Sequence, residues 1–547
     1  MTLLASSPVE PQADTLTNLN GPHAPNSWGA QPDGTFHNPV LPADYSDVDC
    51  IRVADEYYAI SSTFQYSPGM VILRSKDLVN WHIVGHAISD ITQIGPDLNW
   101  DKMNRYGRGV WAGSLRHHAG RFWIYFGTPE EGYFMTSAPR AEGPWEPLTC
   151  VMRGAGWDDC CPFWDDDGQG YLVGTQFAPD PETGKKYNIH LFKLTPDGKA
   201  LMSDFDEILY QSQGSEASKL YKWNGLYHHF FSEVKPEGRV TMMRRSTTLT
   251  GPAEVRQLNH VKQHPSTGEI GDREPNQGGI VQTPDGRWWF VTHQGSGNWE
   301  GRPLCVLPVT WRDGWPIFGE VGADGIGNMV WQDTLPVPGQ PRTVPQSSDN
   351  FQDSELGPQW EWNYQPRVEK WSLSVRPGWL RLHAFAPIQR GNLLKAGNTL
   401  TQRVFGCNGV ATVKLDISQM ANGQAAGLCQ YGGRYAWLGV VQEGGVRWLT
   451  YNFNGTATRG PAIEGALMWL QTSISSNGSA TWAYSLDGRT FTPFGERYGL
   501  EWVNYRGNRL GIFTYNDDGE AGFVDVDEFQ YDFEGPHSCS PHQSHRS

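Results

Sequence analysis

The sequence predicts an all-β protein in which a five-bladed β-propeller is followed by a β-sandwich. Five similar segments recur through the first 330 residues, and they support the propeller. The last 200 residues alternate apolar and polar side chains with period two, and they support the sandwich. At 547 residues the chain is longer than one hydrophobic core usually serves, so more than one domain is expected.

Each of the five segments joins a turn containing glycine or an acidic residue to an aromatic, β-rich run. The segments read ADEYYAISST, HAGRFWIYFGT, DGQGYLVGTQ, WNGLYHHFFSE and DGRWWFVTHQ. Their leading aromatic residues are 49 to 65 residues apart, which is enough chain for four strands each time. No helical period of 3.6 competes with this pattern, so each segment is interpreted as the centre of one blade.

A polar or aromatic residue precedes each leading aromatic by 10 to 12 positions. These residues are Asp47, Trp111, Asp159, Glu216 and Asn276. If the repeats are blades, the five occupy equivalent places on the innermost strands and face the central channel from one end. Three carboxylates would then converge, as glycoside hydrolysis requires, with one acid for the leaving oxygen and one base for water. Taken singly, each carboxylate could instead form a turn or a solvated edge charge.

The surroundings of Glu216 in the sequence, GSEASKLYKWNGLYH, are largely apolar or aromatic. Burial among such residues would raise the pKa of the Glu216 carboxyl, as a general acid requires.

The blade motifs resemble those of glycoside hydrolase family 43, over about residues 36 to 330. The stretch from 38 to 81 is similar to the family's first blade, and four later motifs match in order. These are GVWAGSLRHHAGRFWIYFGT, WDDCCPFWDDDGQGYLVGTQ, GSEASKLYKWNGLYHHFFSE and EPNQGGIVQTPDGRWWFVTHQ. The resemblance implies that Asp47 is the general base, Glu216 the general acid, and Asp159 the residue that orients the acid and tunes its pKa. An ionised Asp159 would disfavour loss of the Glu216 proton.

The same resemblance implies a set of substrate-binding residues. Phe64 and Trp111 look like the rings that wall the terminal sugar subsite, and Arg302 resembles an arginine that hydrogen-bonds sugar hydroxyls. Asn276 and Gln277, in EPNQGG, are expected at the same site. The alternatives are core packing for the two rings and an inter-blade salt bridge for Arg302.

Many members of the family carry a histidine before QGG, near a central calcium or water cluster, where this chain has Asn276. His293 in THQG could replace that histidine. No cofactor is expected to be required for the chemistry, and a structural calcium, with His293 or Asp527 as a ligand, stays open. The DDDG of residues 165–168 lacks the spacing of a calcium loop and is interpreted as a hairpin turn. Asp158 is expected to face the side of the strand opposite to Asp159.

The domain prediction has five parts: an N-terminal extension (1–35), the propeller (36–332), a Pro-rich linker (333–349), the sandwich (350–534) and a C-terminal tail (535–547). DNFQDSELGPQWEWNYQP resembles the start of the concanavalin-A-like sandwich found in one branch of family 43. That likeness implies a second domain that closes one side of the pocket and favours action at chain ends. Asp525 and Asp527 share one face of the last predicted strand, and solvent exposure is favoured over a bound ion.

Composition excludes several kinds of partner. The formal charge of -16 argues against nucleic acid and against an anionic membrane surface. No apolar run is long enough to span a membrane, and no secretory signal is visible, so a cytoplasmic location is expected unless a signal has been removed. The eight cysteines lack disulfide or zinc spacing and are interpreted as free buried thiols, with Cys160 and Cys161 on opposite faces of a strand.

The sequence therefore predicts an inverting, exo-acting glycosidase. Its expected substrates are xylo-oligosaccharides or arabinoxylan, from which it would release β-D-xylosyl or α-L-arabinofuranosyl residues. Two alternatives stay open. One is a retaining five-bladed hydrolase of the fructosidase type, with Asp47 as nucleophile. The other is a propeller that binds glycans without cleaving them.

Overall fold

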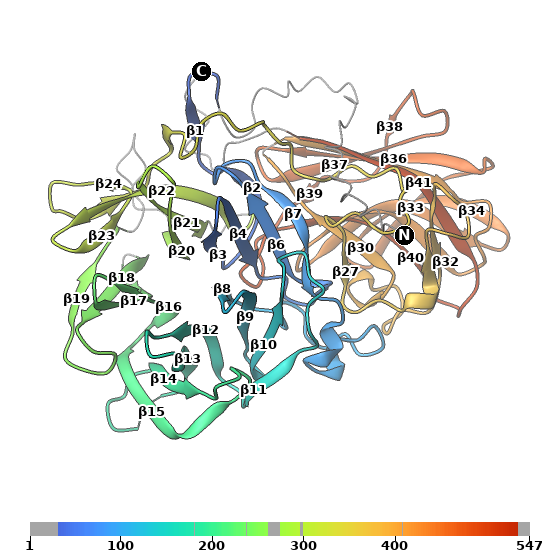
Figure 1. Cartoon of the computed structure of the whole chain (residues 1–547). Helices are drawn as coiled ribbons and strands as arrows, with labels where there is room; N and C mark the ends of the chain where they lie inside the picture. The colour runs from blue at the N-terminus through green and yellow to red at the C-terminus, as the bar shows by residue number, and fades with distance from the viewer. Residues whose placement is uncertain are drawn as a thin grey trace, which may run out of the picture.

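A computed structural model describes residues 31–179, 181–236, 238–260, 274–295, 299–406 and 408–533. The molecule has two lobes, both built almost wholly of antiparallel strands (Figure 1). The predicted N-terminal extension and C-terminal tail lie mostly outside the described residues. Within the described chain no helix has the length and hydrophobicity needed to cross a membrane.

The first lobe is the predicted five-bladed propeller, with its blades arranged around a central channel (Figure 1). Four blades are four-stranded meanders whose first strand is innermost. Blade 1 contains β3 (Asp49–Val53), β4 (Glu56–Ser61), β6 (Gly69–Ser75) and β7 (His82–Ile88). Blade 2 contains β8 (Gly113–His118), β9 (Arg121–Thr128), β10 (Gly132–Ala138) and β11 (Thr149–Arg153). Blade 3 contains β12 (Trp157–Trp164), β13 (Gly170–Phe177), β14 (Tyr187–Leu194) and β15 (Leu201–Ser212). Blade 4 contains β16 (Ser215–Trp223), β17 (Leu226–Lys235), β18 (Gly238–Ser246) and β19 (Glu254–Gln257).

Blade 5 closes the ring with a strand from the other end of the domain. It contains β20 (Glu274–Gln282), β21 (Trp288–Gly295), β22 (Pro303–Arg312) and β23 (Trp315–Phe318). The N-terminal strand β2 (Leu41–Asp44) also pairs with β22, so the first and last parts of the propeller share one sheet. Because β2 ends just before Asp47, this closure also anchors the segment that carries the predicted base.

The second lobe is a sandwich of two sheets, as predicted. The first sheet contains β27 (Glu361–Asn363), β30 (Thr399–Arg403), β32 (Gln424–Tyr431), β33 (Tyr435–Glu443), β34 (Val446–Phe453), β35 (Thr456–Ala462) and β40 (Arg509–Asn516). The second contains β28 (Trp371–Ser372), β29 (Leu380–His383), β31 (Gly409–Asp416), β36 (Leu467–Ser475), β37 (Ser479–Ser485), β38 (Thr492–Pro493), β39 (Tyr498–Gly499) and β41 (Phe523–Phe533). Strand β31 alternates buried and half-buried side chains along its whole length, which is the period-two pattern expected of a strand with one face on the core.

The remaining elements are short. Two small antiparallel pairs join β1 (Thr35–His37) to β26 (Gln332–Thr334) and β24 (Glu320–Val321) to β25 (Gly327–Asn328). Single 3-10 turns form η2 (Ile91–Gln93), η3 (Pro96–Leu98), η4 (Val368–Lys370) and η5 (Leu393–Lys395).

The two lobes are joined by a shared sheet. Strand β5 (Tyr66–Ser67), from blade 1, pairs with β27 and so becomes the edge strand of the sandwich. Next to this junction Glu361 is fully buried and accepts hydrogen bonds from Arg403 (2.8 Å) and Arg509, while His86 of β7 lies 3.1 Å away. Burial alone would raise the pKa of Glu361, but the two guanidinium groups outweigh it and hold that pKa well below its usual range.

Two predicted features of the second lobe need correction. Asp525 does not face solvent: it is 2 % exposed and pairs with Arg376 (2.9 Å) and Arg381 (2.7 Å). Asp527 pairs with Lys414, so a cation side chain already occupies the position proposed for a metal. Sequence alternation placed both residues on one face, but it could not reveal the basic side chains that neighbouring strands bring to that face.

Candidate active site

The inner strands of the propeller all begin at the same end of the channel, and the predicted site residues lie at these beginnings. Asp47 and Trp111 lie just before β3 and β8, and the others lie within the first few residues of their strands. Those others are Asp159 in β12, Glu216 in β16 and Asn276 in β20. Residues from five blades therefore meet at one end of the channel.

The backbone is irregular at two of these positions and at the residues that follow two others. Asp47, Asp159, Ala217 and Gln277 have φ between 49° and 64°, in the left-handed region that residues other than glycine rarely adopt. Pairing with the second strand shifts register at the same places in three blades, for example between Glu216 and Lys219. Such bulges re-aim side chains and recur beside active sites, and the strain they carry costs about 1–3 kcal/mol per residue. The repeated bulge is the local feature that turns the acidic side chains toward the channel.

The carboxylate of Asp47 is held from two sides. Ser62 Oγ donates to its Oδ2 (2.7 Å), and Arg302 Nη1 donates to its Oδ1. Its backbone N–H donates to Nδ1 of the buried His293 (2.8 Å). Arg302 lies just before β22 of blade 5, and Asp47 lies just before β3 of blade 1. The inter-blade salt bridge considered for Arg302 is therefore present. These contacts fix the orientation of the carboxylate.

Asp159 lies in a cluster with the other two carboxyls. It is 2 % exposed and accepts a hydrogen bond from Gln277 Nε2 (2.7 Å). Burial, followed by the charges of Glu216 and Asp47, raises the pKa of Asp159 to about 7. At neutral pH the Asp159 carboxyl is therefore only partly ionised. Glu216 and Asp47 therefore lie close enough to Asp159 to affect its protonation.

The surroundings of Glu216 differ from the prediction. Arg239, on β18 of the same blade, pairs with Glu216 Oε1 at 2.8 Å, so the neighbourhood is not largely apolar. The residues next to Glu216 in the sequence gave no sign of this contact, because Arg239 approaches it across β17 rather than along the chain.

The remaining residues of the acidic stretch 158–168 are structural. Asp158 is buried beneath Gly127 of blade 2, where a Cβ on that glycine would meet Asp158 Cα at 2.6 Å. Asp165 begins the predicted turn, accepting from Gly168 N–H (2.9 Å), and it also binds Lys222 Nζ (2.6 Å) of blade 4. Cys160 and Cys161 belong to different core clusters on the two faces of β12. The cysteines within the described residues are free, and Cys407 and Cys539 lie outside them.

The ring of His293 is not oriented to ligate a calcium ion directly. Its Nδ1 accepts the Asp47 N–H, so the ring proton is on Nε2, and burial with the nearby Arg302 charge holds its pKa well below the usual range. A protonated Nε2 is a donor and cannot coordinate a cation. The described residues contain no group of three or more His, Cys, Asp or Glu side chains arranged to hold a metal ion.

A loop of the sandwich completes the site, and the sequence analysis missed it. Tyr505 lies edge-on to Trp111, with ring centroids 6.0 Å apart. The Arg302 guanidinium lies 5.7 Å from the Trp502 ring and 5.5 Å from the Tyr505 ring. Tyr505 is 53 % exposed, so its ring remains available to a ligand.

Contacts with the propeller hold this loop in place. Ser46 Oγ donates to the Tyr505 carbonyl (3.2 Å), and Gly507 N–H donates to Asp44 Oδ2 (3.2 Å). A side chain at Gly507 would come within 2.6 Å of the backbone at Gly301, so only glycine allows this approach. Phe64 is 3 % exposed beneath the guanidinium of Arg506 in the same loop, which agrees with the packing alternative for that ring.

We expect Tyr505→Ala to raise KM for xylobiose about tenfold and to change kcat less, because it removes one aromatic wall and none of the carboxyls. Steady-state kinetics check this. Tyr484→Ala, which truncates another partly buried tyrosine of the sandwich, is the matched control. An unchanged KM in Tyr505→Ala would show that this loop does not contact the substrate.

The raised pKa of Asp159 predicts a pH-dependent stability. The folded protein holds this proton up to about pH 7, while the unfolded chain releases it near 3.8, so ionisation of Asp159 lowers the stability as pH rises between these values. Asp159→Asn removes that loss. We expect the difference in melting temperature, variant minus wild type, to be larger at pH 8 than at pH 4.5. The same relative melting temperature at both pH values would contradict the burial of this carboxyl.

The fold and the acidic end of the channel together define a carbohydrate-active hydrolase, because three carboxyls meet beneath aromatic rings in a propeller closed on one side. Residues 36–316 match the model of glycosyl hydrolases family 43, and residues 348–532 match that of the β-xylosidase C-terminal concanavalin A-like domain. The chain belongs to glycoside hydrolase family 43.

Individual relatives agree with this assignment. The chain is 36 % identical to a β-xylosidase of Formosa agariphila, over 94 % of this chain and 93 % of that one. It is 29 % identical to a non-reducing end α-L-arabinofuranosidase of Bacteroides ovatus, over 72 % and 73 % of the two chains. Among solved structures, a family 43 protein of Bacillus licheniformis superimposes with a TM-score of 0.76 at 26 % identity, covering 91 % of this chain and 99 % of that one.

Proposed function

We propose that the protein is an inverting, exo-acting hydrolase that releases β-D-xylosyl and α-L-arabinofuranosyl residues from xylo-oligosaccharides or arabinoxylan. The observation that carries this proposal is the cluster of Asp47, Asp159 and Glu216, closed on one side by the 502–507 loop of the sandwich. A closed side favours the end of a chain over its middle. The relatives include both a β-xylosidase and an α-L-arabinofuranosidase, which supports these two sugars.

In the proposed reaction Asp47 acts as the general base. Ser62 and Arg302 hold its carboxylate so that one oxygen can take a proton from a water molecule. That water attacks C1 of the terminal sugar from the face opposite to the leaving group. A new C1–O bond forms as the glycosidic C1–O bond breaks, so the configuration at C1 inverts.

Glu216 acts as the general acid on the other side of the sugar. Arg239 anchors its Oε1, and we assign Oε2 to the glycosidic oxygen, which receives the proton as the bond breaks. Asp159, buried in the same cluster, is assigned the role of orienting Glu216. Inversion requires the Asp47 and Glu216 carboxyls to stand about 6.5–9.5 Å apart, which leaves room for the water.

The test of this proposal is the first-formed anomer, followed by ¹H NMR during hydrolysis of 4-nitrophenyl β-D-xyloside. We expect α-xylose to appear first, before mutarotation. Nitrophenol release from 4-nitrophenyl α-L-arabinofuranoside measures the second activity. Initial formation of β-xylose would instead assign Asp47 as a nucleophile, and the absence of turnover on both glycosides would reject the proposed substrates.

A further inference from the structure

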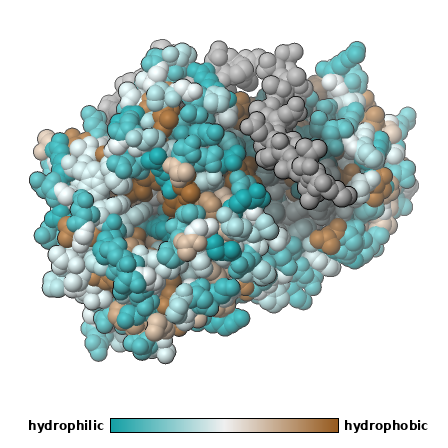
Figure 2. Space-filling view, viewed as in Figure 1, coloured by the Kyte–Doolittle hydropathy of each residue, from teal (hydrophilic) through white to brown (hydrophobic). Residues whose placement is uncertain are grey.

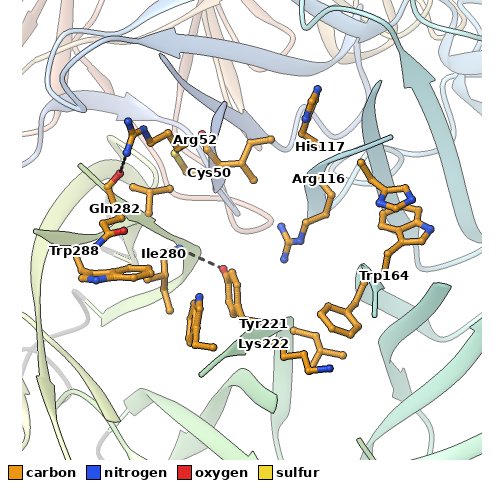
Figure 3. A pocket seen from close by; sticks show the side chains of 16 residues that line it. Cys50, Arg52, Arg116, His117, Trp164, Tyr221, Lys222, Ile280, Gln282 and Trp288 are labelled. Atoms are coloured by element: carbon orange, nitrogen blue, oxygen red, sulfur yellow. Dashed lines mark hydrogen bonds between the residues drawn. The ribbon is translucent and has the colours of Figure 1, made fainter. Parts of the chain in front are cut away.

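The channel has a second cavity, at the end away from the carboxyl cluster. It has a volume of about 410 Å³ and is lined by the last residues of all five inner strands, together with Trp288 of β21. These strands begin at the catalytic end, and the eight residues from Glu216 to Trp223 span about 23 Å of extended chain. Figure 3 shows the lining side chains around the opening, and Figure 2 shows hydrophobic side chains gathered where the middle of the propeller is hollowed. The cavity is therefore separate from the proposed active site.

Aromatic rings make up much of its wall. They are Phe163, Trp164, Tyr221, Trp223 and Trp288, all partly exposed. Tyr221 stacks on Trp223 with centroids 4.6 Å apart and an interplanar angle of 14°. Trp223 is in turn edge-on to Trp288 (5.7 Å). Rings held by one another lose little freedom when a ligand packs on them, and a sugar ring offers a C–H face that suits such a surface.

The polar lining is rich in hydrogen-bond donors and contains no carboxylate. Arg52, Arg116 and Lys222 lie in the wall, although the whole chain carries a charge of -16. Asp49 pairs with Arg116 (2.9 Å) from outside the lining, and Asp165 pairs with Lys222 (2.6 Å).

Arg52 differs from the other two cations. Its Nε donates to the Ala54 carbonyl (2.7 Å) and its Nη1 to the Gln282 carbonyl (2.9 Å). Among the described residues no carboxylate forms an ion pair with it, so these bonds orient its charge without neutralising it. An oriented guanidinium is suited to a carboxylate, which it can bind through two hydrogen bonds.

We propose that this cavity binds a sugar that carries a carboxylate, that is, a uronic acid residue. The sugar ring packs on the aromatic wall, and the carboxylate binds Arg52. A carboxylate only accepts hydrogen bonds, whereas each hydroxyl of a neutral sugar also donates one, so a lining that supplies mainly donors suits the carboxylate better. The proposal concerns binding alone and does not depend on the reaction at the other end of the channel.

Isothermal titration of the full-length protein with methyl β-D-glucuronide and methyl β-D-glucoside tests the proposal, because the two probes differ only at C6. We expect the glucuronide to bind at least about tenfold more tightly, because only its carboxylate can form a charged hydrogen-bonded pair with the Arg52 guanidinium. Added salt should weaken binding of the glucuronide and leave binding of the glucoside unchanged. Trp288→Ala should weaken binding of both probes.

The Arg52→Gln variant should lose the preference for glucuronide, while Arg140→Gln, an exposed arginine of blade 2, should keep it. Turnover of 4-nitrophenyl β-D-xyloside by Arg52→Gln should match wild type, so a failure of this proposal is distinguishable from a failure of the proposed reaction. Equal affinity for the two probes, or no saturable binding of the glucuronide, would overturn the assignment.

Discussion

Glu216→Gln is expected to lower kcat for xylobiose by about 10²–10⁴-fold, the usual contribution of a general acid. Glutamine keeps the shape of the side chain but has no proton to give to the leaving oxygen. The loss should be much smaller on 2,4-dinitrophenyl β-D-xyloside, because dinitrophenolate leaves without being protonated. Steady-state kinetics on the two substrates measure this difference.

Asp47→Asn is the matched control for this experiment. It removes the base that activates water, and both leaving groups need that water, so both substrates should slow to a similar extent. Equal losses on the two substrates in Glu216→Gln would assign Glu216 a role other than proton donor. Arg239→Gln removes the partner that anchors Glu216 Oε1, so it should also slow xylobiose more than the dinitrophenyl glycoside, with a smaller effect than Glu216→Gln.

Glu361→Gln is expected to lower the free energy of unfolding by about 3–5 kcal/mol at pH 7, because it leaves Arg403 and Arg509 buried without their counter-charge. Asp527→Asn breaks the more exposed pair with Lys414 and should cost at most about 1 kcal/mol. Urea unfolding followed by tryptophan fluorescence compares the two. Similar urea midpoints for the two variants would contradict the expected contribution of buried Glu361 to stability at the junction of the two lobes.

The effect of Glu361 should also depend on pH in a defined direction. Its pKa is lower in the folded protein than the 4.5 of the free side chain, so its stabilisation is present above pH 4.5 and is lost as pH falls below that value. The difference between wild type and Glu361→Gln should therefore shrink as the pH is lowered from 7 to about 3.

Much of the fold could be predicted because its signals are local. The aromatic runs after Asp55 and Asp285 mark hairpins in which a turn and its two strands are adjacent in sequence. Repeating such a hairpin five times leaves little choice other than a propeller, and the equivalent offsets then bring Asp47, Asp159 and Glu216 to one end.

The site was only partly predictable, since its remaining members come from distant parts of the chain. Tyr505 approaches Trp111 from the other domain, and the single hint was a stretch, WVNYRGN, in which aromatic residues, an arginine and a glycine fall between predicted strands. Arg239 reaches Glu216 across a neighbouring strand, which no window of sequence around Glu216 reveals.

The sequence by itself determined the two all-β domains, the order of the blades and the residue types placed at the start of each inner strand. Only the tertiary structure decided which charges meet there. A pKa depends on burial and on groups a few ångströms away, and for Asp159 those groups are Glu216 and Asp47, far along the chain but close across the channel. The tertiary structure also decided two closures. Pairing of β2 with β22 closes the propeller ring, and packing of the 502–507 loop against the propeller closes one side of the pocket.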